Sequence, residues 1–444
     1  MNQVATAQSP TLHRNVGLLA LTLYGVGDIL GAGIYGLIGK AAGQMGNSVW
    51  LAFLASMVAA GLTGLSYASL GSRYPKAGGA AYITHRAYNK AWLAYGVGLV
   101  VLASGLTSMA TATRVFSGYF QGLIGGQVSL SLIMIGFALA LALVVFWGIR
   151  ESMWVNALCT VIELSGLAIV IFFGLKFIGA VNYFDATTIA NPSGELGPSL
   201  ILTGAVLTFY SFVGFEDILN IAEEIKNPQR TLPLGLILAV SISSVIYMLV
   251  SVIAVSVIPS GVLANSKEPL VDVVRTAAPW FPASVYSIIA MFAVSNTALL
   301  NFVMGSRLVY GMANQGLLPK PLGKIHPKRK TPYVAAAVLL IILLGLALSG
   351  DISSLAKSTS VLLLSCFMLV NAALVVLKRR KDEPAGAFEV PTIVPLLGAS
   401  VCGCMLLFAQ GPELKTAGII LVSIALLYFA LKPKAEDVKS FDEM

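Results

Sequence analysis

Charged residues are scarce in this sequence. Asp, Glu, Lys and Arg make up only 11% of its 444 residues, whereas a typical soluble domain carries about 25%. Hydrophobic residues account for 57% of the chain, and the mean hydropathy is +0.85. The apolar runs are too long and unbroken for barrel strands, which alternate over about ten residues. The composition therefore excludes a soluble globular protein and predicts an all-α integral membrane protein.

Histidine and cysteine are also rare. The three histidines fall in separate connecting segments, and the four cysteines lie within apolar runs. No metal-ligand cluster, catalytic triad or phosphate-binding loop can be assembled from such a pattern. We predict that the chain is not an enzyme and that it holds no metal or cofactor.

The net charge of +8 does not indicate a nucleic-acid partner. Basic residues gather between alternate apolar runs, most densely over 73–90, 320–330 and 378–381. This asymmetry is typical of the positive-inside rule. It predicts a multi-pass protein of the cell membrane with cytoplasmic N- and C-termini. The lipid bilayer and a small molecule are the expected partners, and the sequence does not indicate an oligomeric state.

Twelve apolar runs are long enough to cross a bilayer as helices. Their approximate limits are 16–42, 47–72, 91–123, 128–148, 152–178, 199–224, 232–258, 280–313, 333–349, 354–377, 392–410 and 415–431. We predict one membrane domain over 16–431, with cytoplasmic tails at 1–15 and 432–444. Within it we expect two repeats of five spans (16–178 and 199–377) and two accessory helices (392–431).

Two of these spans are irregular. The first contains four glycines and an aspartate within Gly27–Gly36, a poor composition for a continuous helix. The sixth combines aromatic residues, a lone glycine and two adjacent acids over 208–217. Main-chain groups freed at membrane depth are tolerated only against protein or a water-filled cavity. Because the two spans open corresponding halves, we predict a binding site at the interface of an inverted repeat.

The chemistry of such a site follows from the helix ends. Free N–H groups at the start of a half-helix favour a carboxylate, and free carbonyls at the end of one favour an ammonium group or a cation. Two adjacent breaks therefore suit a zwitterion. Hydroxyl residues of the third span, among them Ser104, Ser108 and Thr111, either pack helices together or line the cavity.

Glu163 lies near the middle of the fifth span. An acid at this depth is energetically expensive and is functional by default, although a structural glutamate with interior hydrogen bonds is the alternative. Burial favours its neutral form, so Glu163 is a candidate proton carrier.

Five motifs, in order along the chain, resemble the amino acid–polyamine–organocation transporter superfamily. They are Gly-Ala-Gly-Ile at 31–34, Tyr-Pro-Lys-Ala-Gly-Gly at 74–79, Phe-Val-Gly-Phe-Glu at 212–216, the segment 223–230, and Ser306-Arg307 leading to Gly-Leu-Leu-Pro at 316–319. The resemblance covers essentially the whole chain. It implies the leucine-transporter fold and secondary active transport of amino acids by alternating access.

The resemblance also implies roles for particular residues. Ala32 and Gly33 would offer N–H groups to the substrate carboxylate, and the carbonyl of Ile29 would accept from its amine. In the sixth span, Tyr210 matches an aromatic gate in relatives. The remaining substrate-binding candidates of that span are Val213, Gly214 and Phe215.

Two residues depart from the superfamily pattern. Asp28 stands where uncharged residues are common, and Glu163 replaces a lysine found in several proton-coupled relatives. We assign ion or proton coupling to Glu163, Asp28 and Glu216, and favour a proton over sodium. The alternatives are a sodium-coupled amino-acid symporter and a permease or antiporter for polyamines or other organic cations, which the clustered acids favour.

Overall fold

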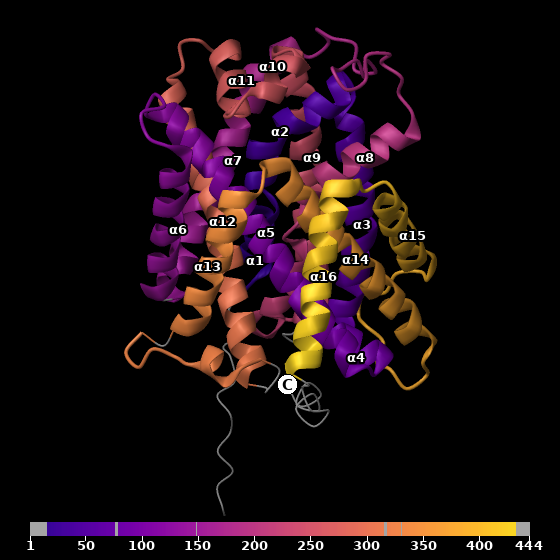
Figure 1. The fold of residues 1–444 in the computed structure, drawn as a ribbon. Helices are drawn as coiled ribbons and strands as arrows, with labels where there is room; N and C mark the ends of the chain where they lie inside the picture. Colours follow the sequence, from indigo (N-terminus) through magenta and orange to yellow (C-terminus); the bar gives the residue numbers. More distant parts are fainter. Residues whose placement is uncertain (1–15, 76–78, 148, 315–317, 330, 432–444) are drawn as a thin grey trace, which may run out of the picture.

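The computed structural model describes residues 16–75, 79–147, 149–314, 318–329 and 331–431 (Figure 1). These residues are mostly helical and form no sheet, apart from an isolated bridge between Val16 and Ile225. The predicted all-α fold is therefore confirmed. Both predicted tails and parts of the motifs at 74–79 and 316–319 lie outside the described residues, as do the side chains of Glu223 and Glu224.

Helices account for both halves of the chain. The first half contains α1 (Leu18–Ile29), α2 (Ala32–Met45), α3 (Val49–Arg73), α4 (Gly79–Tyr88), α5 (Ala91–Leu123), α6 (Leu130–Trp147) and α7 (Ile149–Gly174). The second contains α8 (Pro198–Thr208), the 3₁₀ helices η3 (Phe209–Phe212) and η4 (Phe215–Glu224), α9 (Pro228–Val257), α10 (Ser260–Asn265), α11 (Pro269–Ala277), α12 (Ala283–Asn314), α13 (Tyr333–Ser349), α14 (Ile352–Arg379), α15 (Ile393–Leu407) and α16 (Gly411–Leu431). Short 3₁₀ turns occupy Gly46–Ser48, Leu175–Phe177 and Lys320–Gly323.

Nine segments of the described chain are long and apolar enough to cross a membrane. The first, Leu18–Arg73, contains two of the predicted spans, because only short non-α segments separate α1, α2 and α3. Two other predicted spans correspond to the shorter apolar helices α13 and α15.

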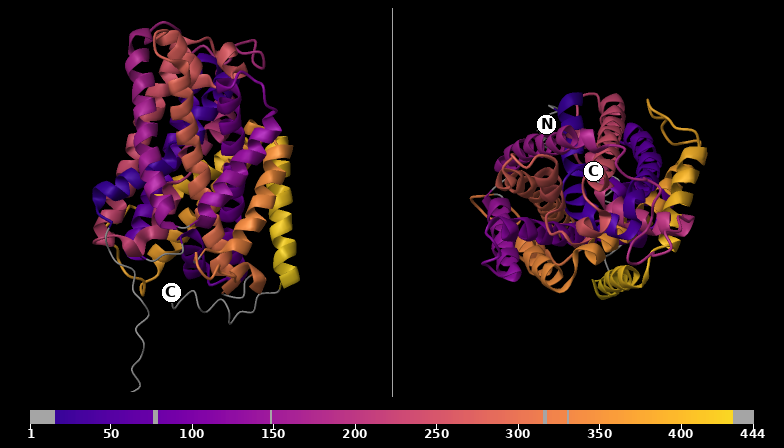
Figure 2. Two further views of the ribbon diagram at one scale, coloured as in Figure 1. Left: turned by 90° about the vertical axis from the view of Figure 1, so that its left-hand side faces the viewer. Right: turned by 90° about the horizontal axis from the view of Figure 1, so that it is seen from above.

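The interrupted helices lie at the centre of the bundle. In Figure 1, α1 and α5 lie behind the outer helices, while α6, α13, α15 and α16 form the periphery. The view from above in Figure 2 shows orange and yellow helices, from the last part of the chain, at the rim of the bundle. Burial follows this order: 72% of the apolar stretch of α14 is buried, against 11% of that of α16. The last helix, α16, is therefore peripheral, and the interrupted helices at the centre of the bundle are shielded from lipid by their neighbours.

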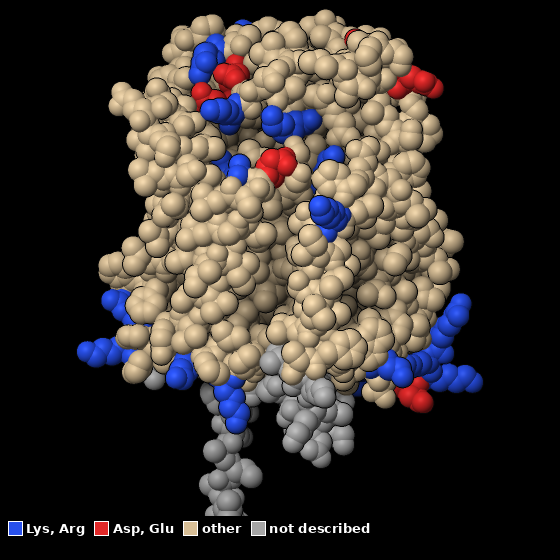
Figure 3. Space-filling view, viewed as in Figure 1, with Lys and Arg blue, Asp and Glu red and all other residues tan. Residues whose placement is uncertain are grey.

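The surface agrees with a protein that spans a membrane. On the face in Figure 3, charged side chains gather toward the two ends, and a belt without visible charge separates them. Large apolar side chains are exposed along the outer helices, for example Leu143 on α6, Ile341 on α13 and Leu426 on α16. Such exposure is expensive in water and is expected beside lipid.

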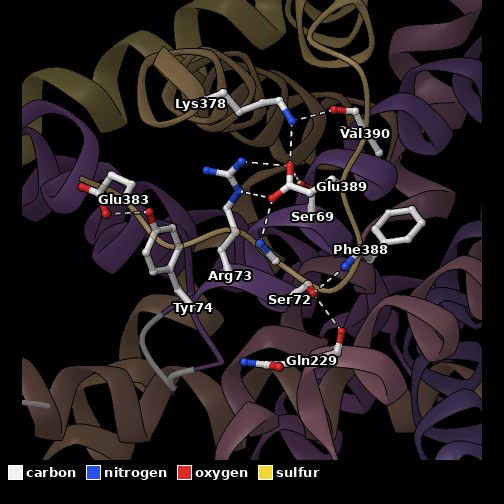
Figure 4. Close-up of polar contacts among 11 residues, drawn as sticks. Ser69, Ser72, Arg73, Tyr74, Gln229, Lys378, Glu383, Phe388, Glu389 and Val390 are labelled. Atoms are coloured by element: carbon white, nitrogen blue, oxygen red, sulfur yellow. Dashed lines mark hydrogen bonds and ion pairs between the residues drawn. The ribbon is translucent and has the colours of Figure 1, made fainter. Parts of the chain in front are cut away.

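Glu389 joins three parts of the chain at the end of the molecule that carries α4 (Figures 1 and 4). Its Oε1 accepts from Arg73 Nε at 2.6 Å, and its Oε2 accepts from Lys378 Nζ at 2.6 Å. The Gly386 N–H also donates to Oε1, at 2.9 Å. Partial burial alone would raise the pKa of Glu389, but these hydrogen bonds outweigh it and lower the pKa to about 2. Glu389 is therefore ionised at neutral pH and ties α3 and α14 to the loop before α15.

Replacing Glu389 with glutamine tests this tie. The variant leaves Arg73 and Lys378 without a counter-charge, so we expect Glu389→Gln to lower the Tm of the purified protein by about 1–4 °C. Because the folded-state pKa is depressed, the stabilisation is complete above the ordinary value of 4.5 and is lost as the pH falls toward 2. The difference in Tm between the wild-type protein and Glu389→Gln should therefore become smaller below about pH 4.5. Glu195→Gln, at an exposed loop position, is the control, and equal Tm values for the two variants at neutral pH would contradict the assignment.

Candidate functional site

Each break in the helices is made by an extended residue followed by a glycine of positive φ. Leu30 and Gly31 (φ 124°) separate α1 from α2, and Val213 and Gly214 (φ 122°) separate η3 from η4. A Cβ on Gly31 would overlap the hydroxyl of Thr297, and one on Gly214 would lie 2.6 Å from the carbonyl oxygen of Asp28. Both positions therefore require glycine for conformation and for space.

The two breaks are in direct contact. A Cβ on Gly33 would overlap the main chain of Ser211, so the absence of a side chain permits this approach. The hydroxyl of Tyr247, on α9, lies 2.6 Å from both the Ile29 carbonyl and the Ser211 carbonyl. Its ring packs against Phe53 and Phe212. One buried hydroxyl thus bridges main-chain groups of both interrupted helices.

A cavity lies between the breaks. It is lined by Asp28, Ile29, Leu30, Ala32, Gly33, Ser108, Tyr210, Val213, Gly214, Asp217, Thr297 and Asn301. Its free volume of about 10 Å³ has room for about one water molecule. A larger ligand therefore enters only when the surrounding side chains or half-helices move.

The structure brings together most of the residues that the sequence singled out. Asp28, Ile29, Ala32, Gly33, Tyr210, Val213 and Gly214 all line the cavity. Phe215 does not, because the turn at Gly214 places its ring against Tyr67 and Phe367, with ring centroids 5.8 and 5.1 Å away. The prediction that Phe215 contacts a ligand in this cavity is therefore not supported by the geometry.

The two other acids assigned to coupling also lie outside the cavity wall. Glu216 Oε2 accepts a hydrogen bond from the Gly214 N–H at 2.9 Å, so this carboxyl caps the start of η4. Glu163 lies behind the first break, where its Oε1 would be 3.4 Å from a Cβ on Gly31. The Glu163 side chain is fully buried, and neither carboxyl oxygen has a hydrogen-bond partner.

Some main-chain hydrogen-bonding groups at the two breaks already have partners within the protein. The Ala32 N–H donates to Thr297 Oγ1 at 3.2 Å, and the Ile29 carbonyl accepts from Tyr247. The Gly33 N–H lies in the first turn of α2, where the helix itself supplies no acceptor. A carbonyl oxygen has two lone pairs, so Ile29 keeps capacity for a second donor. Gly33 and Ile29 thus remain able to bind a ligand without displacing a protein contact.

Polar side chains close one side of the cavity. Ser108 Oγ and Tyr210 Oη are 3.1 Å apart, and Asn301 Nδ2 lies 3.5 Å from Ser108 Oγ. Ser108 was one of the hydroxyl residues for which the sequence left packing or cavity lining open, and it lines the cavity. Asn301 and Tyr247 were missed. A lone tyrosine in an apolar span carries no sequence signal, whereas Asn301 follows the polar triplet 295–297 by one helical turn.

Further unpartnered acceptors occur on α7 and α12, near the end of α1. The Oδ1 atoms of Asn156 and Asn296 are buried without a hydrogen-bond partner, like both Glu163 oxygens. Asn296 Nδ2 instead donates to the Gly27 carbonyl and to Thr160 Oγ1, each at 3.4 Å. Among the residues that the structure describes, no group of three or more His, Cys, Asp and Glu is placed to hold a metal ion.

Comparison with known proteins identifies a family model and several proteins that are similar to this chain. The family model described as amino acid permease matches residues 16–431. The branched-chain amino acid permease BcaP of Bacillus subtilis is 28% identical, over 91% of this chain and 89% of its own length. Cationic amino acid transporter 4 of Mus musculus is 30% identical, over 85% of this chain and 62% of its own length. Cationic amino acid transporter 9 of Arabidopsis thaliana, a chloroplastic protein, is 31% identical, over 73% of this chain and 59% of its own length.

The bridge made by Tyr247 can be tested by removing its hydroxyl. We expect Tyr247→Phe to lower the free energy of unfolding by about 1–3 kcal/mol, because two buried carbonyls lose a shared donor. Tyr95→Phe is the matched control, since the Tyr95 hydroxyl is also buried but has no hydrogen-bond partner. Thermal or denaturant unfolding of both purified variants gives the comparison. Equal destabilisation by Tyr247→Phe and Tyr95→Phe would show that the bridge does not contribute to the free energy of unfolding.

Proposed function

The chain belongs to the amino acid permease family of the amino acid–polyamine–organocation superfamily, and from this premise we propose that it is a secondary active transporter that moves amino acids by alternating access. The observation that carries the proposal is the cavity between two interrupted helices, lined by main-chain groups of both. Helix breaks at corresponding positions of two halves are the usual site of a transported substrate.

The geometry supports a specific mode of binding. The substrate carboxylate would accept from the Gly33 N–H at the start of α2, where the helix dipole favours negative charge. Its ammonium group would donate to the Ile29 carbonyl at the end of α1. Tyr210, held to Ser108 on α5, would act as the gate, and opening this contact would give the cavity the volume that it lacks.

Coupling is proposed to run through Glu163. A buried carboxyl without hydrogen-bond partners is stable only when a proton or a cation neutralises it. Glu163 lies beside Gly31, and Gly31 borders Thr297. A change of charge at Glu163 would therefore reach the first break directly. A proton is the favoured coupling ion, and sodium is the alternative that the unpartnered oxygens of Asn156 and Asn296 would support.

Two further points belong to the proposal. The basic segments at 73–90, 320–330 and 378–381 support cytoplasmic termini in the cell membrane. A polyamine or organic-cation permease remains the second candidate, because Asp28 and Asp217 line the cavity.

Uptake by reconstituted protein tests the transport and its coupling. We expect an imposed pH gradient, acidic on the substrate side, to drive accumulation of labelled amino acid into proteoliposomes without sodium. Glu163→Gln should lower gradient-driven accumulation by about tenfold or more, while exchange of labelled for unlabelled substrate persists. Glu195→Gln, at an exposed loop position, is the control. A strict requirement for sodium at fixed pH would overturn proton coupling, and full gradient-driven uptake by Glu163→Gln would remove this residue from the coupling role.

A further inference from the structure

The loop between α12 and α13 is strongly basic and contains no acid. The sequence has no Asp or Glu between Asp272 and Asp351. The Lys and Arg residues of the segment 318–333, which we call the basic loop, are Lys320, Lys324, Lys328, Arg329 and Lys330. The first four are exposed, and none of them has an acidic partner among the residues that the structure describes. The basic loop therefore presents positive charge that an anion from outside the protein can balance.

Several basic side chains elsewhere at this end of the molecule do have acidic partners. Arg73 and Lys378 contact Glu389 (Figure 4), and Arg86 lies 3.1 Å from Glu383. On the face in Figure 3, blue side chains at the lower left, below α6 and α13 in the view of Figure 1, lie without red ones, whereas red accompanies blue at the lower right. The excess positive charge is thus a local property of the basic loop.

The basic loop is held against the end of α6. Arg329 Nη1 donates to the Trp147 carbonyl at 3.3 Å, and its guanidinium carbon lies 5.1 Å from the centre of the Trp147 ring. Thr331 Oγ1 donates to the Phe146 carbonyl at 3.2 Å, and the His326 ring packs against that of Phe146. An arginine has five N–H donors, so the contact with Trp147 leaves most of the Arg329 guanidinium able to bind an anion.

A lipid-facing stripe of α6 ends at the same place. Leu139, Leu143 and Trp147 follow one another at intervals of four residues, so they share one face of the helix, and all three are exposed. Trp side chains are enriched where a membrane meets water, so Trp147 marks the level of the lipid headgroups. A ligand with an anionic head and apolar chains would contact both the basic loop and this stripe, whereas a soluble anion would contact only the loop.

We infer that the junction of α6 and the basic loop binds an anionic phospholipid, with its phosphate at Lys328 and Arg329 and its acyl chains along the α6 stripe. A guanidinium can donate two parallel hydrogen bonds to a phosphate, and a basic segment beside a membrane-spanning helix attracts anionic headgroups. The segments 146–151 and 318–333 together contain six Lys and Arg residues and one Glu, so a zwitterionic headgroup would leave the excess charge unbalanced. No residue of α6 or of the basic loop lines the cavity between the helix breaks, so this site is separate from the proposed transport site.

Thermal unfolding of the purified full-length protein in detergent tests the site, because a lipid that binds the folded state raises the Tm. Dioleoyl phosphatidylglycerol is titrated in parallel with dioleoyl phosphatidylcholine, which has the same chains but no net charge. We expect phosphatidylglycerol to raise the Tm at a concentration at least about tenfold lower than phosphatidylcholine does. The double variant Lys328→Gln/Arg329→Gln should increase the half-saturating concentration of phosphatidylglycerol by about tenfold.

A second double variant controls for the loss of charge. Lys176, directly after α7, and Lys415, in the first turns of α16, are exposed at the end of the molecule opposite the basic loop (Figure 1). Lys176→Gln/Lys415→Gln therefore removes the same charge, and we expect it to change the half-saturating concentration by less than about twofold.

Each outcome has a definite meaning. Equal shifts with the two lipids would overturn the inference, and so would equal losses of phosphatidylglycerol binding in the two double variants, because any surface cation would then suffice. Inorganic phosphate that alone produced the same shift at the same concentration would overturn the assignment to a lipid. The comparison of the two lipids on the wild-type protein decides the matter even where a variant fails to fold.

Discussion

The hydrogen bonds from Tyr247 to the Ile29 and Ser211 carbonyls are the constraint on which the site depends. A hydroxyl has one proton, so two carbonyls from different interrupted helices share a single donor at 2.6 Å each. This sharing holds the end of α1 against η3, and α2 must then approach Ser211 so closely that only glycine fits at position 33. The cavity is the space that remains where the two helix axes are interrupted.

A binding site built from main-chain groups must leave some of the hydrogen bonds of these groups unmade by the protein. In the membrane interior, each free main-chain group is expensive unless it meets protein or water. Thr297 therefore accepts from the Ala32 N–H, and Glu216 accepts from the Gly214 N–H. If every group were paired in this way, no capacity would be left for a substrate. The structure leaves the Gly33 N–H and one lone pair of the Ile29 carbonyl beside the cavity, and the proposed substrate would complete the hydrogen bonds that the protein leaves open there.

The sequence predicted where the two helices are interrupted, but it did not predict the hydrogen bonds that hold the two interruptions together. Glycine-rich and acidic composition at membrane depth is a local signal, and it correctly predicted that Asp28, Gly33 and Gly214 lie close to one another. Tyr247 gave no such signal, because its role depends on contacts with residues far away in the chain. Phe215 lies outside the cavity because the positive φ of Gly214 redirects the chain, and such a φ cannot be read from composition. The tie between Arg73 and Glu389 joins residues 316 positions apart, and no local pattern predicts such a pair.

The acids near the breaks divide into two groups by what they face. Asp28 and Asp217 line the cavity, whereas Glu163 is fully buried and does not belong to the cavity wall. A Cβ on Gly31 would overlap the Thr297 hydroxyl and would lie 3.4 Å from Glu163 Oε1, so both side chains lie beside this glycine. Because Thr297 also accepts from the Ala32 N–H at the start of α2, the coupling proposed for Glu163 would have to act through the conformation of this one break.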